Sequence, residues 1–500
     1  MDRQIRRAGL ATVALFLVLF AQVSYVQVFA ADRIADHPAN AKRRLIAEYR
    51  VDRGDILAAD GRTVLATSRR TRGELVYERR YPQGPRYAGI TGFSSIVYGR
   101  TGLEASFDDY LSGDAPELFP TTLGDLVLGR PRRGATLVTT VEPAVQAAAE
   151  RALGDQPGAV VAMDPRTGGV LALVSNPTYD PNDLSSQDPR EVRRAWERLN
   201  ADPAEPLRSR ATDELFPPGS SFKLITAAAA LEAGFGPESS WPNPRELDLP
   251  LTENTLQNFG GSHCLGGAPS ITLAQAFQVS CNVTFGEIAL RLGPERLARQ
   301  AWAFGFGPAP GEGDVPFDIP FEEGVFPDPS AFERNDPLLA FAGIGQFDVA
   351  ANPLQMALVA SAIANGGVEM RPRLVSEIRD PQGRVLREIG PEAWGRPISA
   401  TTAAALTRMM VSVVEAGTGT AARLPGVTVA GKTGTAQHGE GEPPHAWFVS
   451  FAPAEDPRVA VAVVVLNGGS LGSEATGGQV AAPIAREVIA AALRIPGTGA

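Results

Sequence analysis

A long, uncharged and mostly apolar run lies close to the N-terminus of the chain. Residues 8–31 contain no charged side chain, and three arginines precede them within the first seven residues. Because about 20 apolar residues cross a bilayer as a helix, this run predicts a membrane span. The positive charge ahead of it places residues 1–7 in the cytoplasm and everything after residue 31 outside. The alternative is a signal peptide cleaved after Ala30, but secretory apolar cores are usually shorter, about 7 to 15 residues. We therefore expect an uncleaved single-pass anchor.

The roughly 470 residues that follow are too many for one ordinary domain. Segment 32–153 is strand-like and interrupted by glycine and arginine, and it predicts a small N-terminal domain. Segment 154–495 combines strand and helix patterns and predicts a larger α/β (α+β) domain. Its expected elements are a hairpin of strands 159–163 and 170–174, later strands at 427–432, 447–451 and 459–466, and a closing amphipathic helix over 479–493.

Charge and composition exclude several classes of function. The net charge is −10 and there is no basic tract, which argues against nucleic-acid binding. No cluster of residues has metal-ligand spacing, and Gly417-Thr418-Gly419 lacks the third glycine of a dinucleotide-binding loop. The sequence therefore predicts neither a metal nor a cofactor.

The distribution of lysine identifies the candidate chemistry. Only three of the 46 basic residues are lysine, and two of these lie in Ser220-Ser221-Phe222-Lys223 and Lys432-Thr433-Gly434-Thr435. Arginine stays charged in proteins, whereas a lysine desolvated beside another cation can lose its proton. A chain that uses arginine almost everywhere keeps lysine where a proton must be exchanged. The two motifs therefore predict a single active site.

The first motif has the geometry of a nucleophile and its base. Pro217-Pro218-Gly219 forms a rigid turn, and the residues after it predict a helix that Gly234 ends. Ser220 at the helix start and Lys223 three residues later share a helix face. Lowering a lysine pKa from about 10.4 to near 7 or 8 costs roughly 3 to 4 kcal/mol, which burial and the charge of Lys432 could supply. Taken alone, the motif also fits a capped helix with a surface lysine.

A third motif, Ser280-Cys281-Asn282, lies between the two lysine motifs. Ser-x-x-Lys, Ser-x-Asn and Lys-Thr-Gly in this order form the signature of penicillin-interacting serine enzymes. The chain resembles the class B penicillin-binding proteins, of actinobacterial type, which are monofunctional D,D-transpeptidases that cross-link peptidoglycan. Further blocks similar to this family's are 53–61, Gly102-Leu103-Glu104, Leu111-Ser112-Gly113, 158–165, Gly343-Ile344-Gly345-Gln346 and 415–420.

The resemblance implies a fold and a role for each motif residue. Over 154–495 it implies the penicillin-binding transpeptidase fold, an antiparallel sheet flanked by helices, and over 32–153 a pedestal or dimerisation-type domain. Ser220 would attack the carbonyl between the last two D-alanines of a stem peptide, and Lys223 would accept its proton. The backbone N–H groups of Ser220 and Thr435 would bind the oxyanion, and Ser280 would relay a proton to the leaving amine. Asn282 would hydrogen-bond a substrate amide, and Lys432 would set the local electrostatic field. Thr433 and Thr435 would bind the terminal carboxylate, and Gly434 would leave room for the substrate backbone.

The resemblance also implies ligands and partners. The expected ligands are peptidoglycan stem peptides and β-lactams. The expected protein partners are a membrane-embedded glycan polymerase and proteins of cell division or elongation.

Several other functions fit the sequence less well. A serine β-lactamase or D,D-carboxypeptidase shares the acylation chemistry but passes the acyl group to water, and the membrane span and N-terminal domain argue against it. A β-lactam sensor would need further spans and a signalling domain, and an inactive scaffold is opposed by the two lysines. Gly468-Gly469-Ser470-Leu471-Gly472 matches a nucleophile elbow, but that class needs a histidine after the serine, and the last histidine is His445.

The chain has two cysteines, Cys264 and Cys281. The region after the span is predicted to be exported, where disulfides persist, so we expect these two to pair. An exposed free thiol between Ser280 and Asn282 would also be prone to oxidation. The alternative is a buried free thiol at Cys281.

Overall fold

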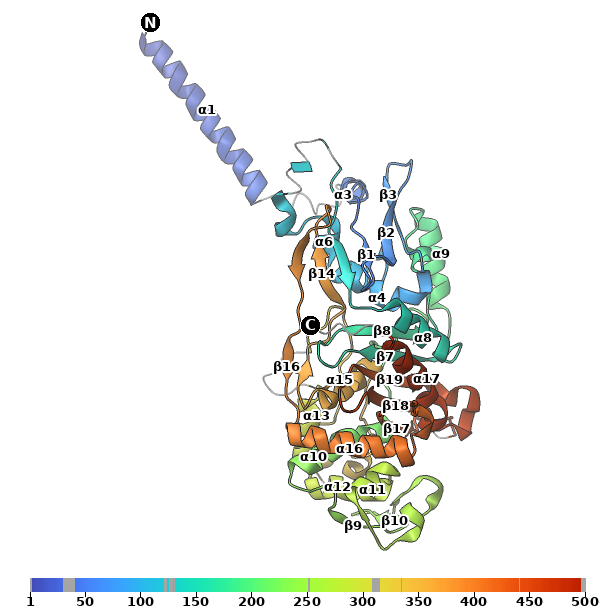
Figure 1. Cartoon of the computed structure of the whole chain (residues 1–500). Coiled ribbons are helices and arrows are strands. Elements are labelled where there is room, and N and C mark those ends of the chain that lie inside the picture. Colours follow the sequence, from blue (N-terminus) through green and yellow to red (C-terminus); the bar gives the residue numbers. More distant parts are fainter. Residues whose placement is uncertain are drawn as a thin grey trace.

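The computed structural model describes residues 2–29, 41–120, 124–125, 129, 131–250, 252–307, 315–333, 335–439 and 441–495. Helix α1 (Asp2–Val28) projects away from the rest of the molecule (Figure 1). From Arg3 onward its side chains are exposed apart from the half-buried Ser24, and the helix is long and apolar enough to cross a membrane. Residues 30 and 31 of the predicted anchor lie outside the described residues, as does 32–40 of the predicted N-terminal domain.

A five-stranded antiparallel sheet forms the centre of the larger domain, with strand order β17-β18-β19-β7-β8. The hairpin predicted over 159–174 is present as β7 and β8. The edge strand β17 begins three residues later than predicted, because residues before Ala430 are not paired with β18. The motif Lys432-Thr433-Gly434 therefore lies in the middle of the edge strand. The strands are β7 (Gly158–Met163), β8 (Val170–Asn176), β17 (Ala430–Ala436), β18 (His445–Ala452) and β19 (Val459–Val465).

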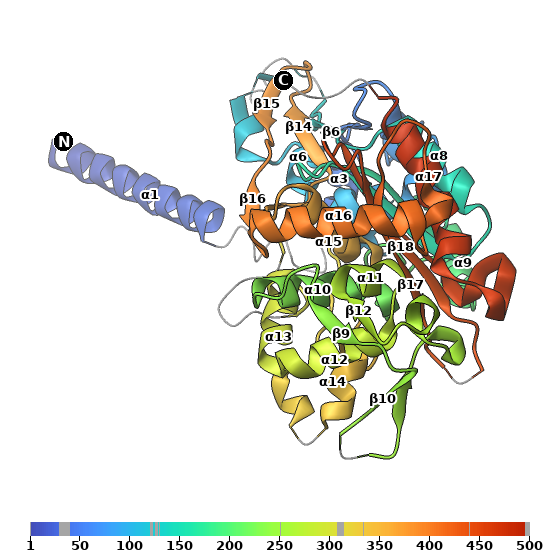
Figure 2. The ribbon, with the colours of Figure 1, turned by 60° about the horizontal axis from the view of Figure 1, so that its bottom comes forward.

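Helices cover both faces of this sheet, since β7, β18 and β19 are buried along their whole length. Helices α8 (Pro143–Leu153) and α17 (Gly477–Ala492) pack on one face through alanine, valine and isoleucine. Helix α15 (Pro353–Ala364) packs on the other face, and α16 (Ala400–Ala416) lies across it (Figure 2). The predicted α+β fold with an antiparallel sheet between helices is therefore confirmed.

Beyond α15 and α16 lies a second group of helices, at the opposite end of the molecule from the N-terminal sheet (Figure 1). It is built around α10 and α12 and carries two small two-stranded sheets, the hairpin β10-β11 and the pair β9-β12. Its elements are α10 (Lys223–Glu232), α11 (Leu273–Gln278), α12 (Asn282–Leu292), α13 (Pro294–Ala303), α14 (Asp336–Ala342), β9 (Ser240–Pro242), β10 (Glu246–Asp248), β11 (Thr255–Gln257) and β12 (Ser270–Thr272).

The N-terminal domain contains a six-stranded sheet of order β15-β14-β6-β1-β2-β3. Three elements cross the predicted division at residue 153: β14 and β15 return from the second segment to this sheet, whereas α8 packs on the larger domain. Strand pairing at such long range leaves no local sequence signal. The strands are β1 (Ile56–Leu57), β2 (Val64–Arg70), β3 (Tyr77–Arg80), β6 (Thr136–Thr139), β14 (Val375–Arg379) and β15 (Val385–Glu388).

The remaining elements are short or lie at the periphery. They are α3 (Ala41–Glu48), α4 (Ala88–Thr91), α5 (Gly102–Ser106), α6 (Asp108–Ser112), α9 (Pro189–Asn200), β4 (Ser94–Ser95), β5 (Gly99–Arg100), β13 (Glu369–Met370) and β16 (Ala393–Gly395).

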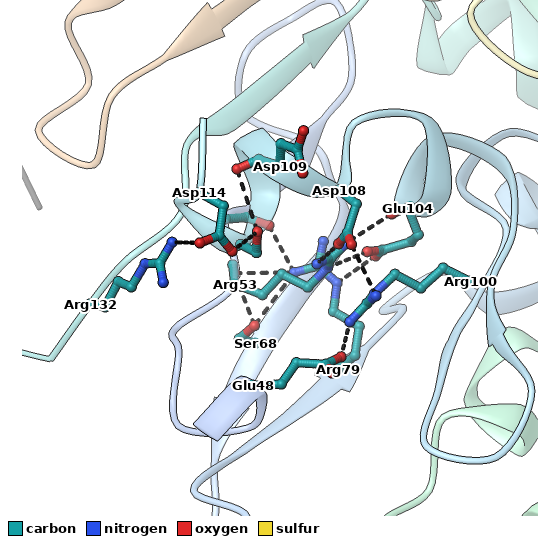
Figure 3. Close-up of polar contacts among 12 residues, drawn as sticks. Glu48, Arg53, Ser68, Arg79, Arg100, Glu104, Asp108, Asp109, Asp114 and Arg132 are labelled. Carbon is teal, nitrogen blue, oxygen red and sulfur yellow. Dashed lines mark hydrogen bonds and ion pairs between the residues drawn. The ribbon is translucent and has the colours of Figure 1, made fainter. Parts of the chain in front are cut away.

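A buried ion network joins separate segments of the N-terminal domain (Figure 3). The fully buried Glu104 carboxylate accepts hydrogen bonds from Arg53 Nε at 2.6 Å and from Arg79 Nε at 2.5 Å. Burial alone would raise the pKa of Glu104, but Arg79 and Arg53 outweigh it and hold that pKa below its usual value. Arg53 also bridges to Asp108. Removing one partner would leave an uncompensated buried charge, so the network fixes how these segments meet.

Candidate active site

Ser220 lies in a short 3-10 turn, Gly219–Phe222, that leads directly into α10. The turn needs glycine at position 219, where φ is +52° and an added Cβ would lie 2.6 Å from the Thr435 carbonyl oxygen. The Gly219 N–H donates to Gly345 O at 2.9 Å. Ser220 faces a cleft of about 1060 Å³ that Ser280, Asn282, Thr433 and Thr435 also line.

Lys223, the first residue of α10, is fully buried and points at the Ser280-Cys281-Asn282 segment. Its Nζ donates to Asn282 Oδ1 at 2.7 Å and to Ser280 O at 2.8 Å, and lies 3.4 Å from Ser280 Oγ. None of these three hydrogen bonds of Lys223 Nζ goes to the Ser220 hydroxyl. The structure thus brings the first and second motifs together through the lysine.

Lys432 reaches the same serine from the sheet. It is fully buried on β17, and its Nζ donates to Ser280 Oγ at 2.9 Å and to Thr433 O at 2.9 Å. The Ser280 hydroxyl therefore lies between two amines. It can accept a proton from one side and donate on the other, which is what a relay requires.

Burial changes the protonation of both amines. Desolvation lowers the pKa of Lys223 well below its usual value, and the nearby charge of Lys432 lowers it further. Desolvation also lowers the pKa of Lys432 to about 7. Neither amine forms a salt bridge to a carboxylate within the part of the chain that the structure describes. Lys432 can therefore gain and lose a proton near neutral pH, and the lowered pKa of Lys223 makes its neutral form accessible, whereas arginine stays charged.

Ser280 is held in an uncommon conformation between α11 and α12, with φ at +60°. Asn258, from the loop after β11, holds the residues that follow Ser280 and was not singled out by the sequence. Its Oδ1 accepts from the backbone N–H groups of Asn282 at 3.0 Å and Val283 at 3.1 Å, so it caps α12. The cap comes from 24 residues away, so no local pattern reveals it.

Cys264 and Cys281 are joined in a disulfide, with their Cα atoms 6.0 Å apart. This bond ties the loop that carries Asn258 to the residue between Ser280 and Asn282. That loop forms one wall of the cleft.

The Lys-Thr-Gly motif forms the opposite wall. A Cβ on Gly434 would lie 2.7 Å from Pro218 O and 3.1 Å from Ser221 N, so glycine allows the edge strand to approach the Ser220 turn. Thr435 Oγ1 accepts from the N–H of Gly477, at the start of α17, over 3.4 Å. Thr433 Oγ1 lies 2.6 Å from the hydroxyl of Thr418, a residue to which the sequence assigned no role in the site.

The elbow-like segment around Ser470 does not form a second catalytic centre. It lies in the irregular turn Leu466–Glu474 after β19. His445 is buried at the start of β18, stacks on His438 with ring centroids 3.8 Å apart, and accepts from the backbone N–H of Asn467. Burial, with the proximity of His438, lowers the pKa of His445 to about 3, so it stays neutral. The described residues contain no group of histidine, cysteine and acidic side chains placed to hold a metal.

Fold and site together define a serine enzyme with paired lysines, and comparison with known proteins agrees. The penicillin binding protein transpeptidase domain family matches residues 158–490, and the penicillin binding protein A dimerisation domain family matches residues 53–137. The chain therefore belongs to the penicillin-binding protein family, as a class B member.

Two relatives resemble the chain over nearly its whole length. Peptidoglycan D,D-transpeptidase PbpA of Mycolicibacterium smegmatis is 44% identical over 99% of both chains. PbpA of Mycobacterium tuberculosis is 42% identical, again over 99% of both. A solved structure of penicillin-binding protein A from M. tuberculosis, a ceftriaxone acyl-enzyme complex, has a TM-score of 0.83 at 41% identity and covers 90% of this chain and 100% of that one. The penicillin G acyl-enzyme complex has a TM-score of 0.81 at 42% identity and covers 89% and 100%.

Proposed function

We propose that this chain is a peptidoglycan D,D-transpeptidase that works through an acyl-enzyme on Ser220 and that β-lactams acylate at the same serine. The observation that carries the proposal is the meeting of two buried lysines at the Ser280 hydroxyl, in the cleft that Ser220 faces. The relatives named peptidoglycan D,D-transpeptidase and the β-lactam acyl-enzyme structures of M. tuberculosis penicillin-binding protein A support it.

The hydrogen bonds of Lys223 suit a neutral amine that acts as a base. A neutral lysine has two N–H groups and one lone pair. Asn282 Oδ1 and Ser280 O occupy the two N–H groups at the shorter distances, which leaves the lone pair to accept the Ser220 proton. Ser220 Oγ then bonds to the carbonyl carbon of the penultimate D-alanine. The N–H groups of Ser220 and Thr435 bind the oxyanion, where one donor is typically worth about 2.7 to 4 kcal/mol.

Collapse of this intermediate breaks the bond to the terminal D-alanine, whose nitrogen must gain a proton. The Ser280 hydroxyl supplies it and is reprotonated from one of the two lysines that contact it. Thr433 and Thr435 bind the terminal carboxylate before it leaves, and Asn282 binds a substrate amide. In the second half-reaction an acceptor amine attacks the acyl-enzyme and gives up a proton to the regenerated base. The bond between the acyl carbon and Ser220 Oγ then breaks, and that base returns the proton to Ser220 Oγ.

The test is the fate of the acyl group in the full-length chain in detergent. A pentapeptide ending in D-alanyl-D-alanine is incubated with a labelled D-amino acid, and exchange is compared with hydrolysis. We expect exchange to exceed hydrolysis; dominant hydrolysis would favour the second candidate, a D,D-carboxypeptidase or β-lactamase. Ser220→Ala should lose both reactions. Ser221→Ala, at a buried hydroxyl that donates to Pro218 O, is the matched control and should keep them.

The charge of the N-terminal residues indicates how the protein is oriented in the membrane. We propose that residues 1–7 are cytoplasmic and the catalytic domain extracytoplasmic, because the arginines precede the span. Intact cells should then label with a membrane-impermeant fluorescent penicillin; labelling only after lysis would reverse the orientation. As partner we propose a membrane-embedded glycan polymerase working with division or elongation proteins, to be tested by site-specific crosslinking from α1.

A further inference from the structure

The turn after α16 presents a hydroxyl to the edge strand of the cleft. Thr418 lies between Gly417 and Gly419, in the triplet that fits no nucleotide-binding loop. Its side chain is exposed and lines the cleft, and its Oγ1 lies 2.6 Å from Oγ1 of the buried Thr433. Either hydroxyl can donate in this pair.

The backbone of Thr418 is held on several sides. The N–H groups of Gly417 and Gly419 both donate to Val413 O, at 3.1 and 3.0 Å. A Cβ at Gly417 would lie 2.3 Å from Gln278 O, and one at Gly478 would lie 2.2 Å from Thr418 O. Because α11, α16 and α17 all meet this turn so closely, the Thr418 hydroxyl is preorganised toward Thr433.

Proton counting decides the direction of the hydrogen bond during substrate binding. A hydroxyl has one proton, and an ionised carboxylate can only accept. If Thr433 gave its proton to Thr418, it would have none for the terminal carboxylate of a stem peptide or β-lactam. We propose that Thr418 donates to Thr433 and thereby directs the Thr433 proton to that carboxylate. Thr418 is then a positioning residue, and this inference rests on the proposed role of Thr433.

The relay should also change the strength of the hydrogen bond between Thr433 and the ligand carboxylate. Hydrogen bonds in a chain polarise one another, so a donor behind Thr433 strengthens the bond that Thr433 makes to the carboxylate. The effect should appear only with ligands that carry the carboxylate. It should also vanish when Thr433 has no hydroxyl, because Thr418 acts through it.

The experiment uses the full-length chain in detergent and measures acylation against benzylpenicillin concentration. Thr418→Val keeps the shape but removes the donor. We expect it to raise the half-saturating concentration about fivefold to tenfold, as for loss of one net hydrogen bond, with little change in the limiting rate. Thr418→Ser should restore the wild-type value within about twofold. The matched control is Thr407→Val on α16, whose hydroxyl donates to Ala403 O and which should acylate normally.

Two comparisons make the proposal falsifiable. In a Thr433→Val background, Thr418→Val should cause no further loss; additive losses would overturn the relay, since independent effects add. With the methyl ester of benzylpenicillin, Thr418→Val and wild type should react alike; an equal loss with acid and ester would show a structural effect and overturn the proposal. If the wild type is not acylated on Ser220 at all, the proposed function fails first and this inference with it.

Discussion

Replacing Lys223 by arginine separates two roles that a lysine can have in this site. Arginine keeps the positive charge, but its guanidinium cannot give up a proton in a protein and so cannot accept one from Ser220. If Lys223 is the base, the variant loses acylation. If Lys223 only supplies charge, the variant keeps its acylation activity.

The magnitude follows from the surroundings of the side chain. Lys223 is fully buried, and its Nζ already has acceptors at 2.7 and 2.8 Å, so a guanidinium would be held charged by Asn282 and Ser280. Loss of a general base typically costs about 10² to 10⁴ in rate. The larger head group adds about 1 to 3 kcal/mol of overpacking, so thermal unfolding must be measured alongside.

The assay is the second-order rate of acylation by a fluorescent penicillin at pH 7.5. We expect Lys223→Arg and the uncharged Lys223→Met to lose at least about 10² in rate, each while remaining folded. A Lys223→Arg rate within about threefold of wild type, with Lys223→Met inactive, would refute the assignment of this residue as base.

Four other predictions concern the same site. The pKa of Lys432 is about 7 in the folded chain, against 10.5 ordinarily. Between pH 7 and pH 10.5 the unfolded chain therefore binds a proton at Lys432 that the folded chain does not bind. The free energy of unfolding should rise with pH across this window. Lys432→Met should therefore raise the melting temperature most below pH 7, by the equivalent of about 4 to 5 kcal/mol, and least near pH 10; a pH-independent change contradicts this. Gly434→Ala should slow acylation at least about tenfold, because its Cβ would meet Pro218 O, whereas Gly395→Ala, which meets nothing within 4 Å, should not; equal rates would contradict the close approach. Replacing Cys264 and Cys281 by serine should cost about 3 kcal/mol of stability in denaturant titrations, and two free thiols in the unreduced, denatured wild type would exclude the disulfide. Acylation should fall as pH drops and Lys223 takes up a proton, with a midpoint well below the ordinary pKa of a lysine; a rate that stays flat over the whole pH range in which the protein remains folded would argue against a lysine base.

Local sequence predicted the parts of the site that depend on neighbouring residues. Ser220 and Lys223 share one turn, and Lys432 to Thr435 lie on one strand, so short motifs were sufficient. Asn258 and Thr418 were missed, because each meets its partner only after the chain folds back from a distant segment. The return of β14 and β15 to the N-terminal sheet and the start of β17 were missed for the same reason: pairing with another strand decides them, and it leaves no trace in the local pattern.

The most direct test of the central claim is the mass of the full-length chain after reaction with benzylpenicillin. We expect a gain of one intact penicillin, located on Ser220 by peptide mapping, with half-lives of minutes to hours after excess ligand is removed. A transpeptidase must keep water from competing with its acceptor amine, so the acyl-enzyme should be long-lived. An adduct on another residue, no adduct, or release within seconds would show that Ser220 is not the nucleophile of a transpeptidase.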